Sequence, residues 1–353
     1  MSHRLADFYR GKRVLVTGHT GFEGGWAVAW LKFLGAQVCG YGLPPATRPN
    51  FFDATLLDRG MTSIFADIRD RNSLANAFTE LQPEIVIHCA AQTSPQSSMQ
   101  QPVDAFSTNV MGTVHILEEA RLTHSVRAIV LVTTHSCCRN EGHSLRETNG
   151  SGANDLLSAT MASAELARSA FNKSFFPTAG TAVATARIAP AIGGGNWLEG
   201  DIVADLVRRI MLGDPVPAIK ETDRELRIWH VLEPVRACLL LARNLFERGQ
   251  KSADLWDFAP SDEGRISPSE FPEKFTSLWN GAAAAPQKNS SKPSKGSKSG
   301  SSKASAEFGW SPVLSTDQAL AWTVEWYRSF YLNSSSTLRT TEDQIERYMR
   351  MTA

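Results

Sequence analysis

Five short apolar runs, separated by helical patterns, constrain the fold of this chain more than any other feature. They are RVLVTG (13–18), QVCGYG (37–42), SIFADI (63–68), EIVIHCA (84–90) and AIVLVTT (128–134). Near-continuous apolar strands are typical of parallel sheets that helices cover on both faces. Helical patterns lie at 22–34, 71–81, 102–124 and 154–175, and TAVATARIA (181–189) predicts a sixth strand. The alternation predicts an α/β fold with a Rossmann-type, doubly wound parallel sheet.

The strand–helix pattern loosens after residue 190, which predicts a second part of the chain. We expect a Rossmann domain at 1–190, including helix 154–175, a smaller C-terminal α/β substrate domain at 191–334, and a tail at 335–353 that includes a further helical pattern. Helices are expected near 201–213, 233–248 and 316–331. Residues 281–306 are rich in Ser, Lys, Gly and Ala and contain no aromatic or acidic residue, so we expect most of this insert to be disordered. The alternative is that this basic tract docks an acidic partner.

Composition excludes several classes of function. The chain has 36 Lys and Arg residues and 36 Asp and Glu residues, so its formal net charge is zero. We therefore expect no binding to nucleic acid or to an anionic membrane surface. No apolar run approaches the roughly 18 residues of a membrane span, and the N-terminus has no apolar core of a secretory signal. The 5 cysteines show no CxxC spacing. We therefore expect no disulfide framework, no metal site and a cytoplasmic location.

The segment VTGHTGFEGG (16–25) follows a predicted strand and opens a predicted helix. Its glycines, Gly18, Gly21 and Gly24, have GxxGxxG spacing, and Thr20 and Phe22 lie between them. A tight turn without side chains lets the backbone approach a diphosphate, which then sits on the helix N-terminus. The motif predicts a dinucleotide-binding loop.

Further residues are candidates for the same cofactor. Asp67 and Ile68, at the end of the third strand, are placed to cup an adenine, and the small residues Ala90 and Ala91 allow a close approach after the fourth strand. Asn109 is placed either to brace a strand or as an ordinary helix residue. The second strand ends without the acid that favours NAD, while Arg48 is either a partner for a 2′-phosphate or an exposed loop residue. We expect NAD, with NADP left open.

Several of these segments together resemble the CDP-glucose 4,6-dehydratases, members of the extended short-chain dehydrogenase/reductase superfamily. The resemblance rests on GKRVLVTGHTGFEGGW, MTSIFADIRD, PEIVIHCAAQ, TNVMGTV, IGGGNW, HVLEP and SSKASAEFGWSP, in order from about residue 8 to about residue 330. It implies an NAD-binding domain, a smaller domain for the nucleotide sugar, and loss of water from C5 and C6 after a hydride leaves sugar C4. That chemistry requires proton transfer at C4, at C5 and at the leaving hydroxyl.

The chain departs from the family where those protons are moved. The family's YxxxK motif aligns on NDLLSATMASAEL (154–166), which places Leu157 at the Tyr position and Met161 at the Lys position. After the fifth strand the family's hydroxyl is retained as Thr134. His135 replaces its Asp, and Ser136 replaces its Lys.

The substrate contacts implied by the family are also altered. Met99 replaces a Tyr, and Pro190 replaces an Asn that binds phosphate. Asn196 and Trp197 of IGGGNW remain candidates for substrate binding, and Arg227, or Arg224, for a phosphate.

The favoured hypothesis is a family member that keeps the dinucleotide loop but has lost dehydratase catalysis, and binds or regulates in sugar-nucleotide metabolism. The rival hypothesis is an active NAD(P)-dependent enzyme on a nucleotide sugar that uses His135 and Thr134. By resemblance, helices 102–124 and 154–175 are expected to form the interface of a homodimer or of a dimer with a paralogue.

Overall fold

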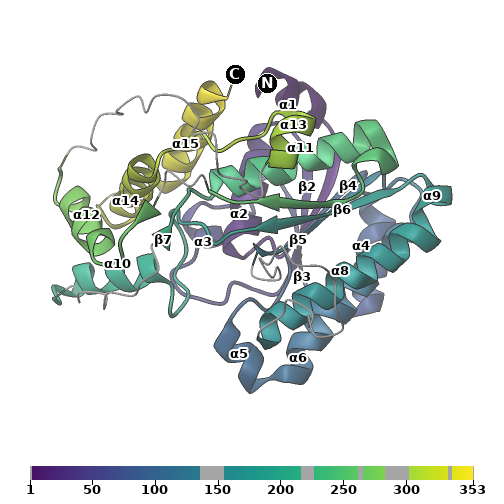
Figure 1. Cartoon of the computed structure of the whole chain (residues 1–353), viewed down its shortest axis with the longest axis horizontal. Helices are drawn as coiled ribbons and strands as arrows, with labels where there is room; N and C mark the ends of the chain where they lie inside the picture. The colour runs from purple at the N-terminus through teal and green to yellow at the C-terminus, as the bar shows by residue number, and fades with distance from the viewer. Residues whose placement is uncertain are drawn as a thin grey trace.

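Seven parallel strands form the central sheet of the molecule, in the order β3-β2-β1-β4-β5-β6-β8 (Figure 1). The computed structural model describes residues 2–135, 155–215, 226–260, 265–282, 302–332 and 336–352. The strands are β1 (Arg13–Thr17), β2 (Gln37–Gly42), β3 (Thr62–Phe65), β4 (Ile85–His88), β5 (Ala128–Thr134), β6 (Ala182–Ile188) and β8 (Leu255–Phe258). The strand order reverses between β1 and β4, which is where open α/β sheets bind ligands. The predicted doubly wound fold is confirmed.

Both faces of the sheet are buried, and successive residues of a strand serve different cores. Val14 and Val16 belong to one core cluster, whereas Leu15 between them belongs to the other. Strand β4 repeats the pattern, with Ile85 and Ile87 on one side and Val86 on the other. Because side chains alternate across a strand, a strand buried on both faces is apolar at every position. This is the physical reason for the uninterrupted apolar runs in the sequence.

Helices cover both faces of this sheet (Figure 1). Contacts place α2 (Phe22–Phe33) and α11 (Leu232–Arg248) on one face, and α4 (Arg71–Leu81), α7 (Gly112–Leu122) and α8 (Leu156–Ser174) on the other. The first helix, α1 (Ser2–Tyr9), packs on α11, where the Tyr9 hydroxyl donates to the carbonyl of Leu239 at 2.8 Å.

The expected helix at 102–124 is one continuous helical run with an irregular turn. It consists of α6 (Pro102–Phe106), a π-helical turn at Ser107–Met111 and α7, and it follows the short helix α5 (Pro95–Gln100). Such π turns occur frequently at functional sites. Here the turn contains Asn109.

Two elements beyond residue 190, one strand and one helix, pair with or pack on the central sheet. Strand β8 pairs with β6, and α11 packs on β4, β5 and β6. The sequence patterns predicted the helix but not the strand. The remaining helices of this part are α10 (Ile202–Leu212), α12 (Glu270–Trp279) and α14 (Thr316–Leu332), beside a small antiparallel pair of β7 (Leu226–Arg227) and β9 (Arg265–Ile266). Short helical turns complete the described elements: α3 (Phe51–Ala54), α9 (Phe176–Ala179), η3 (Gly249–Ser252) and α13 (Ser302–Phe308).

The end of the insert at 281–306 is ordered, which corrects the expectation for this part of it. Helix α13 begins at Ser302, Ala304 is buried, and the Lys303 ammonium lies over the ring of Trp256 at 4.2 Å. Residues 283–301 of the insert lie outside the described residues.

The expected tail at 335–353 contains α15 (Thr337–Met351), which packs on α2 and α14. The Tyr348 ring packs edge-on against Trp30, and its hydroxyl donates to Glu233 of α11 at 2.5 Å. Glu233 also accepts the backbone N–H groups of Val313 and Leu314. The C-terminal helix is therefore part of the core.

Candidate functional site

The glycine motif forms a tight turn between β1 and α2. Gly18 has a positive φ of 71°, and a Cβ there would lie 2.8 Å from the backbone nitrogen of Ala90. A Cβ on Gly24 would lie 2.2 Å from the carbonyl oxygen of Gly18. Both positions therefore require glycine. Gly21 caps α2 without a side-chain hydrogen bond, so the first N–H groups of the helix receive no acceptor from a capping side chain.

This turn forms one wall of a cavity of about 500 Å³ at the carboxyl ends of the strands. Eleven residues predicted from the sequence line it: Gly18, Thr20, Gly21, Phe22, Gly24, Asp67, Ile68, Ala90, Ala91, Asn196 and Trp197. The structure thus brings together residues from the ends of β1, β3 and β4 and from the IGGGNW segment. Asn109, Arg227, Thr134, His135, Leu157 and Met161 are not among the residues that line it.

Sequence reasoning missed the wall of the cavity that follows β2. Leu43, Pro44, Ala46, Thr47 and Asn50 lie there, and none of them carries a charge. No sequence motif marked them, because their place depends on how the loop folds back. The Thr20 hydroxyl donates to the carbonyl of Leu43 at 2.8 Å, which ties this loop to the glycine turn.

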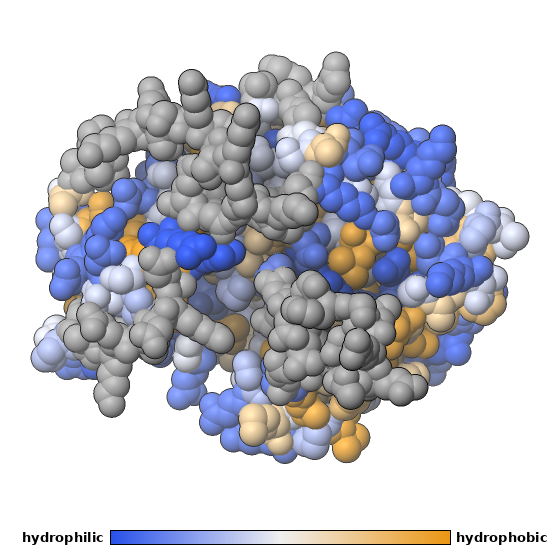
Figure 2. Space-filling view, viewed as in Figure 1, coloured by the Kyte–Doolittle hydropathy of each residue, from blue (hydrophilic) through white to orange (hydrophobic). Residues whose placement is uncertain are grey.

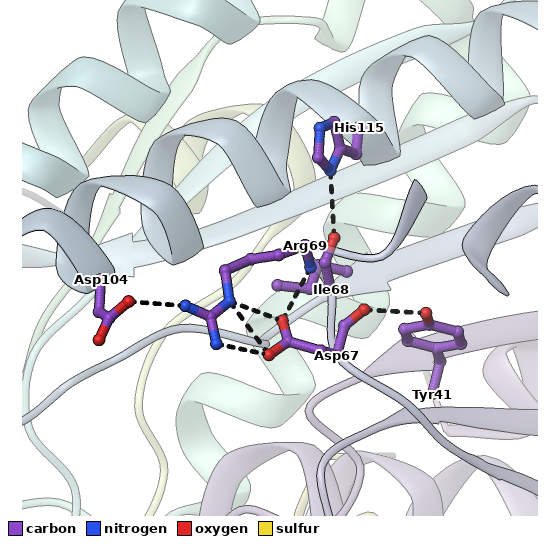
Figure 3. A network of polar contacts seen from close by, with 6 residues as sticks. All are labelled: Tyr41, Asp67, Ile68, Arg69, Asp104 and His115. Carbon is purple, nitrogen blue, oxygen red and sulfur yellow. Dashed lines mark hydrogen bonds and ion pairs between the residues drawn. The ribbon is translucent and has the colours of Figure 1, made fainter. Parts of the chain in front are cut away.

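An ion network fixes the turn that follows β3 (Figure 3). The Asp67 carboxylate accepts hydrogen bonds from the backbone N–H of Arg69 and from its guanidinium, whose Nη2 lies 2.8 Å away, and these bonds lower the pKa of Asp67. The same guanidinium donates to Asp104 at 2.8 Å. The Tyr41 hydroxyl donates to the carbonyl of Asp67 at 3.0 Å, and His115 Nδ1 lies 3.3 Å from the carbonyl of Ile68. Asp67 and Ile68 are therefore held from three neighbouring elements.

A chain of hydrogen bonds fixes the segment that follows β4. The Thr17 hydroxyl lies 2.6 Å from Nδ1 of His88, and Nε2 of His88 lies 3.1 Å from the Thr113 hydroxyl. The Thr113 hydroxyl donates to the carbonyl of Asn109, and the N–H of Ala90 donates to Thr17. These bonds assign the proton of the ring to Nε2. Burial lowers the pKa of His88 to about 4, so this histidine is neutral and structural.

Asn109 completes that chain. Its amide accepts the N–H of Gln92 at 2.7 Å and donates to the carbonyl of Gln92 at 3.0 Å and to the Thr160 hydroxyl of α8 at 2.8 Å. Asn109 is buried and braces the segment at 89–92 from the π turn. It lies one layer behind the cavity wall.

The residues at the end of β5 and on α8 form a separate cluster. Glu165 accepts hydrogen bonds from the Thr133 hydroxyl at 2.8 Å and from both the Nε and Nη2 atoms of Arg187. His135 Nδ1 lies 3.5 Å from Oδ1 of Asp257 on β8, a partner that the sequence did not indicate. On α8, Leu157 is half-buried and Met161 is buried. Ser136 lies outside the described residues.

A second, larger cavity of about 1080 Å³ adjoins the first. It lies between the segment at 93–100 and α10, and it shares Thr93, Asn196, Leu198 and Asp201 with the first cavity. Arg208 and Arg209 bring positive charge to its wall, which also carries the acids Glu199, Asp201, Asp205 and Asp214. Arg227 does not line it.

The described residues lack two kinds of feature. They contain no group of three or more His, Cys, Asp or Glu side chains arranged to hold a metal ion. None of the helices in these ranges is long and apolar enough to cross a membrane.

The fold and the cavity match a known class of protein. The model of the NAD dependent epimerase/dehydratase family matches residues 14–253, which is most of the chain, and the chain belongs to this family. Within it, the chain is 35% identical over 356 residues to CDP-glucose 4,6-dehydratase of Salmonella typhimurium, covering 98% of each protein. The resemblance inferred from the sequence motifs is confirmed.

Solved structures show the same fold. UDP-glucose 4-epimerase of Thermotoga maritima with UDP-glucose has a TM-score of 0.70 at 22% identity, over 90% of this chain and 98% of that one. The dTDP-glucose 4,6-dehydratase of Bacillus anthracis in complex with NAD has a TM-score of 0.67 at 18% identity, over 91% of this chain and 98% of that one.

Proposed function

We propose that this protein binds NAD and a nucleotide sugar in the two adjoining cavities and does not catalyse 4,6-dehydration. The observation that carries the proposal is the contrast between the glycine turn and α8. The turn admits no Cβ at Gly18 or Gly24 and so fits a closely approaching diphosphate. On α8, the positions aligned with the family's Tyr and Lys are Leu157 and Met161, neither of which transfers a proton.

The expected loss of rate is large. When bound, NAD supplies a hydride acceptor, but the C4 hydroxyl must also lose its proton, and a positioned acid or base contributes about 10²–10⁴ in rate. Met161 is buried. Its thioether carries no charge and cannot replace the ammonium group of the family's Lys. Losses at groups that act together are not additive, but changes at Leu157, Met161 and Ser136 together remove the family's machinery for moving protons.

The second cavity supports binding of a nucleotide sugar. It shares Thr93, Asn196, Leu198 and Asp201 with the first, so the two cavities are neighbours and two ligands could lie side by side. Arg208 and Arg209 are available to its wall as partners for a phosphate, although the Arg208 guanidinium already donates to Asp205 and to the carbonyls of Trp197 and Leu198. We assign this role to α10 and to the segment at 93–100, which line the cavity.

The test is an assay for loss of water from CDP-glucose in the presence of NAD⁺, followed by mass spectrometry. The Salmonella typhimurium enzyme serves as the positive control. We expect no 4-keto product from this protein at enzyme concentrations that exhaust the substrate in the control reaction. Formation of that product would contradict the proposal.

A second candidate function is supported by the contact between His135 and Asp257. An imidazole beside a carboxylate can act as a general base, and Thr134 precedes His135 in the chain. Neither His135 nor Asp257 lines either cavity, which makes this the weaker candidate. It predicts NAD(P)H formation or consumption, with a nucleotide sugar present, that disappears in His135→Ala and weakens in Asp257→Asn. Unchanged activity in His135→Ala would exclude it.

We also propose that the protein forms a dimer through the helices on the α8 side. Exposed apolar side chains lie on α5, α6, the π turn and α8: Met99, Val103, Phe106, Met111 and Leu166. In Figure 2 hydrophobic residues gather over α8 and below it, over α5 and α6. A homodimer or a dimer with a paralogue would bury them.

Cys39, Cys89 and Cys238 are free thiols, which is consistent with a cytoplasmic location.

A further inference from the structure

Glu23 places a carboxyl group at the deep end of the first cavity. It lies in the first turn of α2, between Phe22 and Gly24 of the glycine motif, and lines the cavity with them. The same residue lines a small apolar hole beneath, formed with Cys89, Val132, Ile188 and Cys238 among others. Its side chain therefore lies where the cavity meets the core of the sheet.

No cation neutralises this carboxyl group. In the described part of the chain, Glu23 forms no ion pair, and the charged group that acts on it is Asp201, a second acid on the cavity wall. Arg69 is the one cation among the described residues that line the cavity, and it is bound to Asp67 and Asp104. Burial raises the pKa of Glu23, Asp201 raises it further, and its own backbone N–H acts in the opposite direction.

The other titratable groups that face Glu23 stay neutral or are already used. Cys89 follows β4, and Cys238 lies on α11; burial raises the pKa of Cys89 well above its usual range and that of Cys238 to about 12. Burial raises the pKa of Asp201 as well, but its carboxylate caps α10 through the N–H groups of Val203 and Ala204 and accepts from Asn196. The strands β5 and β6 contribute the apolar Val132 and Ile188. Among the described residues, Glu23 is therefore the carboxyl group on this wall whose hydrogen-bond partner is its own backbone N–H, and it can change charge.

A carboxylate in this place conflicts with the ligand that the glycine turn fits. A dinucleotide brings a diphosphate to the N-terminus of α2, and the diphosphate stays ionised throughout the neutral range. Two like charges in a cavity of low polarity repel strongly, so one of them is neutralised. Of the two buried carboxyl groups on this wall, Glu23 lacks the capping hydrogen bonds that hold Asp201, so we expect Glu23 to take up the proton.

We propose that the dinucleotide binds to this protein with uptake of one proton by Glu23, so that affinity falls as the pH rises. This inference rests on the proposed function, because it requires that the cavity binds a dinucleotide. It makes Glu23 a residue that sets cofactor affinity according to pH. By linkage, uptake of one proton changes the affinity by up to about tenfold per pH unit.

The experiment is a calorimetric titration of the full chain with NADH from about pH 5.5 to about pH 8.5, in pairs of buffers with different heats of ionisation. NADH is the probe because its reduced ring carries no charge. Three proteins are compared: the wild type, Glu23→Gln, and Glu80→Gln, which removes one exposed carboxylate on α4 that does not line the cavity. The buffer pairs report the number of protons taken up on binding.

The wild type and Glu80→Gln are expected to lose affinity as the pH rises and to take up close to one proton. Glu23→Gln is expected to bind with little dependence on pH and more tightly than the wild type at the highest pH. Binding of NADH by the wild type without proton uptake would overturn this inference alone, and that measurement does not depend on the variant folding. Binding with the same pH profile in Glu23→Gln and wild type would also overturn it. Absence of binding in all three proteins would overturn the proposed function as well.

Discussion

At the scale of single residues, the site depends on side chains that do not line the cavity. Asn109 holds both backbone groups of Gln92 and ties them to Thr160 of α8. His88, with its pKa lowered by burial, connects β1 to the π turn through two threonines. These contacts fix the backbone that forms the cavity wall after β4, and a wall held in place in advance costs less to order when a ligand binds.

Asn109→Ala is expected to lower the free energy of unfolding by about 1–3 kcal/mol, because it leaves buried groups of Gln92 and Thr160 without their partner. It is also expected to weaken dinucleotide binding, since residues 89–91, next to Gln92, line the cavity. Urea unfolding and NAD⁺ titration measure the two effects. Asn172→Ala is the matched control, because its amide makes a single hydrogen bond at 3.4 Å. Equal stability losses in both variants would show that Asn109 is not a brace.

Among single residues, the sequence predicted those positions where the backbone conformation requires a particular residue type. Gly18 and Gly24 could be predicted because a side chain at either position would collide with the backbone. Glu23, between the same glycines, was passed over because an acid in the first turn of a helix is ordinary in a sequence. The partnership of His135 with Asp257 was equally invisible, because the two residues meet only through the pairing of β6 with β8.

At the scale of elements, the strands buried on both faces were predictable and the edge of the sheet was not. Strand β8 has only four residues, LWDF, with buried and half-buried positions alternating, and it exists because β6 offers it a partner. The π turn at Ser107–Met111 could not be predicted, because the pattern of apolar residues does not distinguish a π turn from the α-helix around it. Residues 302–306 of α13 fall in the tract whose Ser- and Lys-rich composition predicts disorder. Composition alone does not indicate that Ala304 belongs to the same core cluster as Trp256.

The C-terminal helix α15 gives a prediction at this scale. Tyr348→Phe is expected to lower the free energy of unfolding by about 1–3 kcal/mol, because the buried Glu233 carboxyl loses a hydrogen-bond donor. Tyr331→Phe, which removes a half-buried hydroxyl 3.2 Å from Trp197 Nε1, is the control and is expected to cost less. Urea denaturation of the full chain measures both. A smaller loss for Tyr348→Phe than for Tyr331→Phe would mean that α15 is not held through Glu233.

At the scale of the whole molecule, the architecture is that of an NAD dependent epimerase/dehydratase. Two cavities meet at Thr93, Asn196, Leu198 and Asp201, one against the sheet and one against α10. Family motifs in the sequence predicted the fold and eleven of the residues that line the first cavity, because those residues lie mostly next to strand ends. The second cavity could not be delimited, since its wall joins α5 and α10, which lie about a hundred residues apart in the sequence.

The central claim is that the protein binds NAD but does not use it for dehydration. The most direct test is one titration with NAD⁺, alone and with CDP-glucose present, in which affinity and product are followed in the same samples. We predict saturable binding of NAD⁺, a change in its affinity when CDP-glucose is present, and no 4-keto sugar at the end of the titration. Accumulation of the 4-keto product, or no binding of NAD⁺ under either condition, would contradict this account.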